Sequence, residues 1–209
     1  LIALSLIGQV SKYLLGHPML KGFVPLFYVD YEMNIPTWYS SAALALAACL
    51  LTLIGIAMVS RKEPYRWHWC GLAMIFFLLS ADEIAMIHEI PIDPMRAAFQ
   101  TSGVLYYPWV ILGAAFAGTV GICYLGFLLH LPRVTRWQFV LAAGTFLGGA
   151  IGVEMISGWQ ADRYGEENLT YALIVTVEEM LEMLGIVLFI RAIVQYIHQR
   201  FGGAQIQIG

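Results

Sequence analysis

Long apolar stretches separated by short polar loops dominate the chain from residue 38 onward. A helix needs about 20 apolar residues to cross a bilayer, and five stretches are long enough: 38–59, 69–89, 107–129, 137–158 and 169–190. Each is expected to be helical, because an open strand cannot satisfy its backbone hydrogen bonds in lipid. A shorter apolar segment, 1–15, is interrupted by Gln9 and Lys12. It is expected to be the end of a sixth span, a surface helix or a re-entrant piece.

Aromatic residues lie at the ends of these stretches, where amphipathic rings favour the membrane–water interface. Examples are Trp38, Trp69, Tyr107, Trp137 and Trp159. The loops between the stretches are short, and neither a soluble domain nor an internal repeat is visible. The pattern therefore predicts an all-α fold, a polytopic transmembrane helix bundle. It forms a single domain over 1–209 with five full spans and a short N-terminal sixth.

The composition agrees with a protein that is solvated by lipid. Apolar and aromatic residues make up 60% of the chain and charged residues only 12%, whereas about 25% of a soluble domain is charged. This excludes a disordered chain, a secreted disulfide scaffold and an ordinary cytosolic enzyme. A net charge of -3 and the lack of a basic run indicate no nucleic-acid partner. The lipid bilayer is the expected partner.

The basic residues predict the orientation of the bundle. Seven of them fall on one side, at 61, 62, 66, 133, 136, 191 and 200, and four on the other, at 12, 21, 96 and 163. Because lysine and arginine concentrate in cytoplasmic loops, the side with seven is expected to be cytoplasmic. An integral protein of a bacterial inner membrane is predicted, with its C-terminus in the cytoplasm.

Half of the 14 acidic residues lie inside the predicted spans, which is unusual for a membrane protein. They are Asp82, Glu83 and Glu89 on the second span, Glu154 on the fourth, and Glu178, Glu179 and Glu182 on the fifth. The helical rise places Asp82 and Glu178 about 20 Å above the cytoplasmic ends of their helices, and Glu154 about 26 Å above. Three helices therefore bring carboxylates to overlapping heights in the outer, periplasmic half of the bilayer.

These carboxylates have no basic partner at their depth, and a central acidic side chain costs about 2.5–3.5 kcal/mol to insert. They must therefore be protonated, hydrated in a cavity or neutralised by a bound cation. Carboxylates with few imidazoles suit iron, manganese, calcium or zinc better than copper. The sequence predicts a divalent metal site with the ligands Asp82, His88, Glu89, Glu154, Glu178 and Glu182. Residues expected to support these ligands from behind are Glu83, Glu179, Met86 and His17.

Helical geometry refines which of these side chains can meet. If the second span is one continuous helix to residue 89, Asp82 and Glu89 share a face, with Met86 between them. On the same helix, Glu83 and His88 point about 140° apart and cannot both face the centre of one site.

Other features receive structural interpretations. Asp30 and Glu32 lie in a predicted outer loop that could fold over the acidic cluster, and the favoured interpretation is that they are solvated loop residues. Gly144, Gly148 and Gly152 form a ridge of small residues, which is typical of close helix packing in membranes.

The most specific function that this pattern favours is a membrane metalloprotein with a carboxylate-rich site, in its narrowest form a di-metal oxidoreductase. Whether the protein is an enzyme stays open, and no catalytic residue is identified. Two alternatives remain. One is a proton- or cation-coupled transporter, because intramembrane acids mark ion paths. The other is a non-catalytic subunit that binds further membrane subunits.

Overall fold

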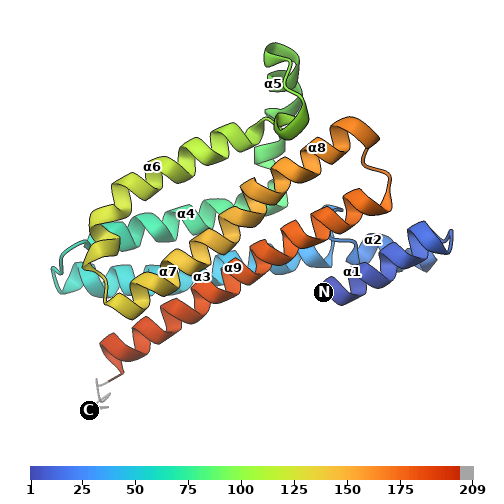
Figure 1. The fold of residues 1–209 in the computed structure, drawn as a ribbon. Helices are drawn as coiled ribbons and strands as arrows, with labels where there is room; N and C mark the ends of the chain where they lie inside the picture. The colour runs from blue at the N-terminus through green and yellow to red at the C-terminus, as the bar shows by residue number, and fades with distance from the viewer. Residues whose placement is uncertain (203–209) are drawn as a thin grey trace.

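The computed structural model describes residues 1–202, and every regular element in them is helical (Figure 1). In chain order the elements are α1 (Ile2–Gln9), the π-helical η1 (Val10–Leu14), the 3-10 turn η2 (Leu20–Gly22), α2 (Phe23–Phe27), α3 (Ile35–Ser60), α4 (Arg66–Ala85), the 3-10 turn η3 (Ile87–Glu89), α5 (Ile92–Phe99), the 3-10 turn η4 (Gly103–Leu105), α6 (Trp109–His130), α7 (Arg133–Leu147), the π-helical η5 (Gly148–Val153), α8 (Glu154–Tyr164) and α9 (Leu169–Phe201). The predicted all-α class is confirmed. The last part of the predicted domain, 203–209, lies outside the described residues.

Four helical segments are long and apolar enough to cross a membrane. They are α3, α4, α6 and the continuous run Arg133–Tyr164 that comprises α7, η5 and α8. The fifth predicted span lies within α9, which has 33 residues but is not one of these four. The segment Ile2–Leu14 is apolar but shorter.

Local sequence explains where the long helices begin. The side chain of Asn34 accepts a hydrogen bond from the amide of Thr37 at 3.2 Å, and Pro36 stands in the first turn of α3. Asn168 caps α9 in the same way and accepts from the amide of Tyr171 at 2.9 Å. Both caps satisfy amides that have no partner inside the helix.

The end of α4 differs from the prediction. The helix ends at Ala85, and Met86 adopts a left-handed conformation with φ 51° before the short turn η3. Both carboxylate oxygens of Asp82 are engaged by His88, which donates its amide at 2.8 Å and brings its Nδ1 to 2.9 Å. Asp82 thus stabilises a turn that breaks the helix. The predicted continuous helix to residue 89, with Asp82 and Glu89 on one face, was wrong.

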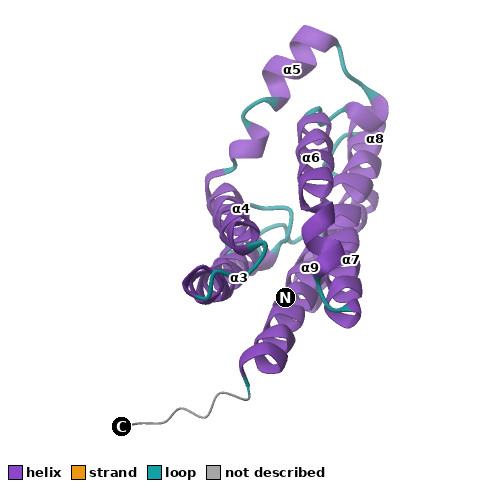
Figure 2. Ribbon diagram, turned by 90° about the vertical axis from the view of Figure 1, so that its left-hand side faces the viewer, coloured by secondary structure: helices purple, strands orange, loops and turns teal. Residues whose placement is uncertain are grey.

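The long helices form two groups that are visible from the side (Figure 2). The first group is the antiparallel pair of α3 and α4, in which Ser41 and Ser80 each donate a hydroxyl hydrogen bond to the other's carbonyl at 2.9 Å. The second group contains α6, α7–α8 and α9, and α9 packs along both α7 and α3. The end of the bundle that holds the start of α9 is named the acidic end, and the opposite one the basic end.

The closest helix approaches do not use the predicted glycine ridge. A Cβ on Gly144, Gly148 or Gly152 would meet nothing within 4 Å. A Cβ on Gly149 would instead lie 2.7 Å from the carbonyl oxygen of Glu178, and one on Gly185 would lie 2.7 Å from the amide nitrogen of Phe146. Gly149 and Gly185, rather than the ridge, therefore allow α7, η5 and α9 to touch through their backbones.

Aromatic residues pack the basic half of the bundle. The ring of Trp69 lies 4.9 Å from those of Tyr196 and Phe127, and Phe76 stacks on Phe189 at 4.4 Å. These contacts join α4, α6 and α9 in one core. Burying large aromatic side chains is a major source of stability, so this half of the bundle is its rigid part.

The first 34 residues cover the acidic half of α9 (Figure 1). Gln9 of α1 is buried and donates to the hydroxyl of Thr176 on α9 at 2.6 Å. Ser5 accepts from the amide of Val29 at 3.2 Å, which folds the following loop back onto α1. This loop reaches the acidic end of the bundle, where the site lies. The helix α5 was not predicted, and in Figure 2 it projects beyond the same end.

Candidate functional site

A cavity of about 990 Å³ lies between α4, α6, α7–α8 and α9. Eleven of the 14 acidic residues of the chain line it: Asp30, Glu32, Asp82, Glu83, Glu89, Glu154, Glu166, Glu167, Glu178, Glu179 and Glu182. Among the described residues that line the cavity, none is a lysine or an arginine. The charge of the site is thus almost entirely of one sign.

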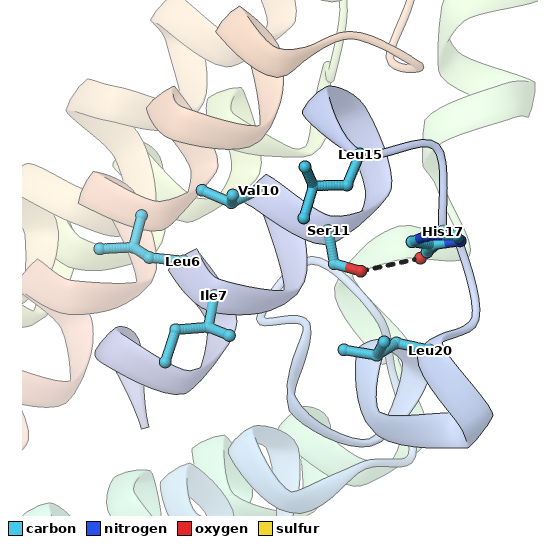
Figure 3. A pocket seen from close by; sticks show the side chains of 7 residues that line it. All are labelled: Leu6, Ile7, Val10, Ser11, Leu15, His17 and Leu20. Atoms are coloured by element: carbon cyan, nitrogen blue, oxygen red, sulfur yellow. Dashed lines mark hydrogen bonds between the residues drawn. The ribbon is translucent and has the colours of Figure 1, made fainter.

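The structure brings together all six predicted ligands, because each of them lines this cavity. Glu83 and Glu179, expected behind the ligands, line it directly. The broken end of α4 removes the constraint of a continuous helix, so Glu83 and His88 both border the cavity. Met86 does not line it, because it forms the left-handed end of α4. His17 lies by a separate apolar hollow of about 360 Å³ on the first segment, where its carbonyl accepts from Ser11 at 3.1 Å (Figure 3).

Asp82 and His88 form an ion pair at the edge of the cavity. Their closest atoms, Oδ2 and Nδ1, lie 2.9 Å apart. Burial alone would lower the pKa of His88, but the hydrogen bond and the charge of Asp82 outweigh it and raise that pKa above its ordinary value. The charged imidazolium is therefore favoured, and a metal would have to displace this proton before His88 could act as a ligand.

A second set of hydrogen bonds holds Glu154 and Glu178. The indole of Trp109, at the start of α6, donates to Glu154 Oε1 at 2.8 Å. Ser157, one turn further on α8, donates to Glu178 Oε2 at 3.0 Å. The ring of Trp109 also lies 4.9 Å from that of His88. Trp109 thus connects Glu154 of α8 with the Asp82–His88 pair.

Glu179 and Glu182 differ from these residues because no hydrogen bond within residues 1–202 fixes their side chains. Their neighbours act on them through charge, and Glu83 and Glu32 act on both. The backbone below them is fixed, since Gly149 packs against the Cγ of Glu182 and the carbonyl of Glu178. Two unpartnered carboxyl groups therefore stand on a rigid backbone beside the cavity.

Asp30 and Glu32 line the cavity from the first segment. Asp30 is partly buried, which corrects its interpretation as a solvated loop residue, whereas Glu32 keeps much of its surface exposed. Burial, followed by the charge of Glu166, raises the pKa of Asp30 to about 6. Burial, followed by the charge of Glu89, also raises the pKa of Glu32. Sequence reasoning left them out of the candidate site because the folding of this loop over α9 depends on distant contacts. The only local indication was their alternation with aromatic residues in 27–32.

A lysine side chain contacts the outer rim of the cavity. Lys12 lies 2.9 Å from Glu167 and donates to the hydroxyl of Tyr31 at 3.1 Å. On the other side, Tyr107 donates to Glu166 at 2.7 Å. These contacts occupy the outermost acids of the cavity. Within residues 1–202, Glu83 of α4 and the three acids of α9 are left without a cationic partner.

The chemistry of the donors, though not their spacing, matches a metal site. They offer carboxylate oxygens and one imidazole, the ligands of manganese, iron, calcium and zinc. Among residues 1–202, no group of three or more histidine, cysteine, aspartate or glutamate side chains is close enough together to hold a metal ion. Coordination would require side chains to turn toward the middle of the cavity.

Comparison with known proteins gives a family but no function. One family model matches residues 1–196, and its description is "Domain of unknown function (DUF8692)". Neither the curated proteins nor the solved structures contain a match to the chain. The cavity itself must therefore carry the functional argument.

Proposed function

Because the chain belongs to this family of unknown function, we propose its function from the cavity alone: it binds a divalent metal ion among the carboxylates. One observation carries the proposal. The six ligands expected from the sequence, contributed by different helices, line the same cavity, and no lysine or arginine among the described lining residues neutralises them. Like charges at this density repel one another strongly in a medium of low polarity, so a bound divalent cation would relieve the repulsion.

The contacts divide the carboxylates into two roles in this proposal. Asp82, Glu154 and Glu178 already accept hydrogen bonds, which orient ligands and tune their basicity. Glu179 and Glu182 have no such bonds in the described chain and can turn toward an incoming ion. A largely oxygen donor set favours manganese, iron or calcium, with zinc next and copper last. Iron or manganese would make the protein a candidate oxidoreductase.

Metal analysis of the purified full chain tests the proposal. Protein from metal-replete cells is expected to carry about one or two metal ions per chain, and the stripped protein is expected to bind Mn²⁺ saturably in a titration followed by electron paramagnetic resonance. Glu178→Gln and Glu154→Gln should each weaken this binding by at least about tenfold. Glu63→Gln is the matched control, because Glu63 pairs with Arg200 at 2.6 Å at the basic end. Wild-type protein that neither carries metal nor binds Mn²⁺ would refute the proposal.

We further propose that α9 completes five membrane spans, with the acidic end on the periplasmic face of a bacterial inner membrane. The excess of lysine and arginine at the basic end supports this orientation. Single cysteines test it in a chain whose three native cysteines are replaced by alanine. A membrane-impermeant thiol reagent should label Ser102→Cys in intact cells and Lys62→Cys only after lysis. The reverse pattern would contradict the orientation.

A further inference from the structure

The acidic residues account for only one end of the cavity. The other end extends toward the aromatic core and is apolar. Its lining includes Leu72, Phe76, Val120, Tyr124, Phe139 and Phe189. A volume of about 990 Å³ is at the upper end of the range for small-molecule sites, which is about 300–1,000 Å³. One metal ion with its ligands would fill a small part of it, so the apolar end needs a separate explanation.

Glycine and alanine on α6 and α7 keep this end open. Gly121 of α6 and Gly144 of α7 line the cavity, and a Cβ on either would meet nothing within 4 Å. Ala117 and Ala143 line it as well. The two glycines therefore contribute open space and not helix contact. An apolar space left empty sacrifices dispersion contacts with its walls, so a hydrocarbon occupant would stabilise the bundle.

The cavity is also placed for entry from the bilayer. α4 and α6 both line it, and their backbones stay apart along the described chain, with Trp69 meeting Phe127 at 4.9 Å near the basic end. Figure 2 shows α6 standing apart from the α3–α4 pair. A molecule already dissolved in the membrane could enter between these two helices without crossing the polar rim.

We propose that the cavity binds a membrane-soluble amphiphile, whose hydrocarbon chain occupies the apolar end and whose headgroup reaches the carboxylates. Ionised carboxylates only accept hydrogen bonds, so the headgroup must carry donors, as a hydroxyl or an ammonium group does. In the metal-free protein, repulsion from the eleven acidic residues of the lining disfavours an anionic headgroup. This proposal goes beyond metal binding, because its main contacts lie in the half of the cavity that has no metal ligands.

Three probes that share one hydrocarbon chain and differ only in the headgroup test which headgroup the cavity accepts. Radiolabelled oleylamine, oleyl alcohol and oleate are added to the full-length protein in nanodiscs. Saturable binding of the amine, the alcohol or both is expected, and preference between them identifies the headgroup as ammonium or hydroxyl. Saturable binding of oleate as tight as that of the other two, or of no probe, overturns the proposal.

Matched glycine variants test the location. Gly121→Leu combined with Gly144→Leu fills the apolar end and should weaken binding at least tenfold. Gly118→Leu combined with Gly152→Leu makes the same changes on the same segments at positions that are open but do not line the cavity, and it should bind as the wild type does. Equal binding by both pairs overturns the proposal. If the first pair does not fold, Gly121→Leu against Gly118→Leu gives the same comparison. Metal content, measured in every sample, reports separately on the metal site.

Discussion

The contact of α9 with α7 at Gly185 makes a quantitative prediction about stability. A Cβ at this position would lie 2.7 Å from the amide nitrogen and the Cβ of Phe146 and 2.8 Å from its Cα, whereas ordinary contact begins at 3.4 Å. The shortfall of 0.7 Å involves backbone atoms, which cannot rotate away. Gly185→Ala must therefore push the two helices apart, and overpacking of this kind costs about 1–3 kcal/mol.

The matched control is Gly118→Ala on α6, where a Cβ would meet nothing within 4 Å. Both variants gain the better helix propensity of alanine, worth about 1 kcal/mol, so the difference between them isolates the steric cost. For a chain of this size, 1 kcal/mol corresponds to about 2–4 °C. In thermal unfolding followed by intrinsic fluorescence in detergent, Gly185→Ala should melt about 2–12 °C below Gly118→Ala. Melting temperatures that agree within about 1 °C would show that this close approach is incorrect.

Three further predictions concern the site. The pKa of Asp30 is raised from 3.8 to about 6, so its stabilising contribution is complete below pH 3.8 and is lost as the pH rises through 6. Raising the pH from 4 to 7 should cost the wild type about 2 kcal/mol relative to Asp30→Asn in chemical unfolding. Trp109→Phe keeps a ring beside the cavity but removes the donor to Glu154, and should lower the free energy of unfolding by about 1–3 kcal/mol; an unchanged value would mean that the bond is not formed. Gly149→Ala, whose Cβ would lie 3.0 Å from the Cγ of Glu182, should weaken Mn²⁺ binding more than Gly185→Ala does. Equal effects of the two variants would show that the packing at Gly149 does not influence metal binding.

Hydropathy and helical rise predicted much of the arrangement. The apolar runs located the long helices, because lipid leaves few alternatives to helical structure. Counting residues along each run placed Asp82, Glu154 and Glu178 at overlapping heights, and all three line one cavity. These inferences succeeded because they depend on length and period, which are properties of each segment alone.

The features that the sequence did not predict depend on contacts between distant segments or on local irregularity of a helix. No glycine or proline marks the end of α4, since the break is made by Asp82 binding the backbone and ring of His88. Asp30 reaches the cavity only because its loop folds onto α9. The glycine ridge was misjudged because the regular helical period does not hold through η5, where Gly149 makes the close contact instead.

The π-helix η5 also constrains how sequences of this family can vary. Its wider turn accommodates extra chain within an otherwise regular helix that runs from Arg133 to Tyr164, as an inserted residue would. Deletion of one residue between 148 and 153 would convert this turn to regular α-helical winding and leave the helix on either side in its present register. Glu154 would then keep its place in the cavity although its spacing from Gly149 had changed. A one-residue gap between Gly149 and Glu154 in an alignment is therefore no sign that the site has been lost.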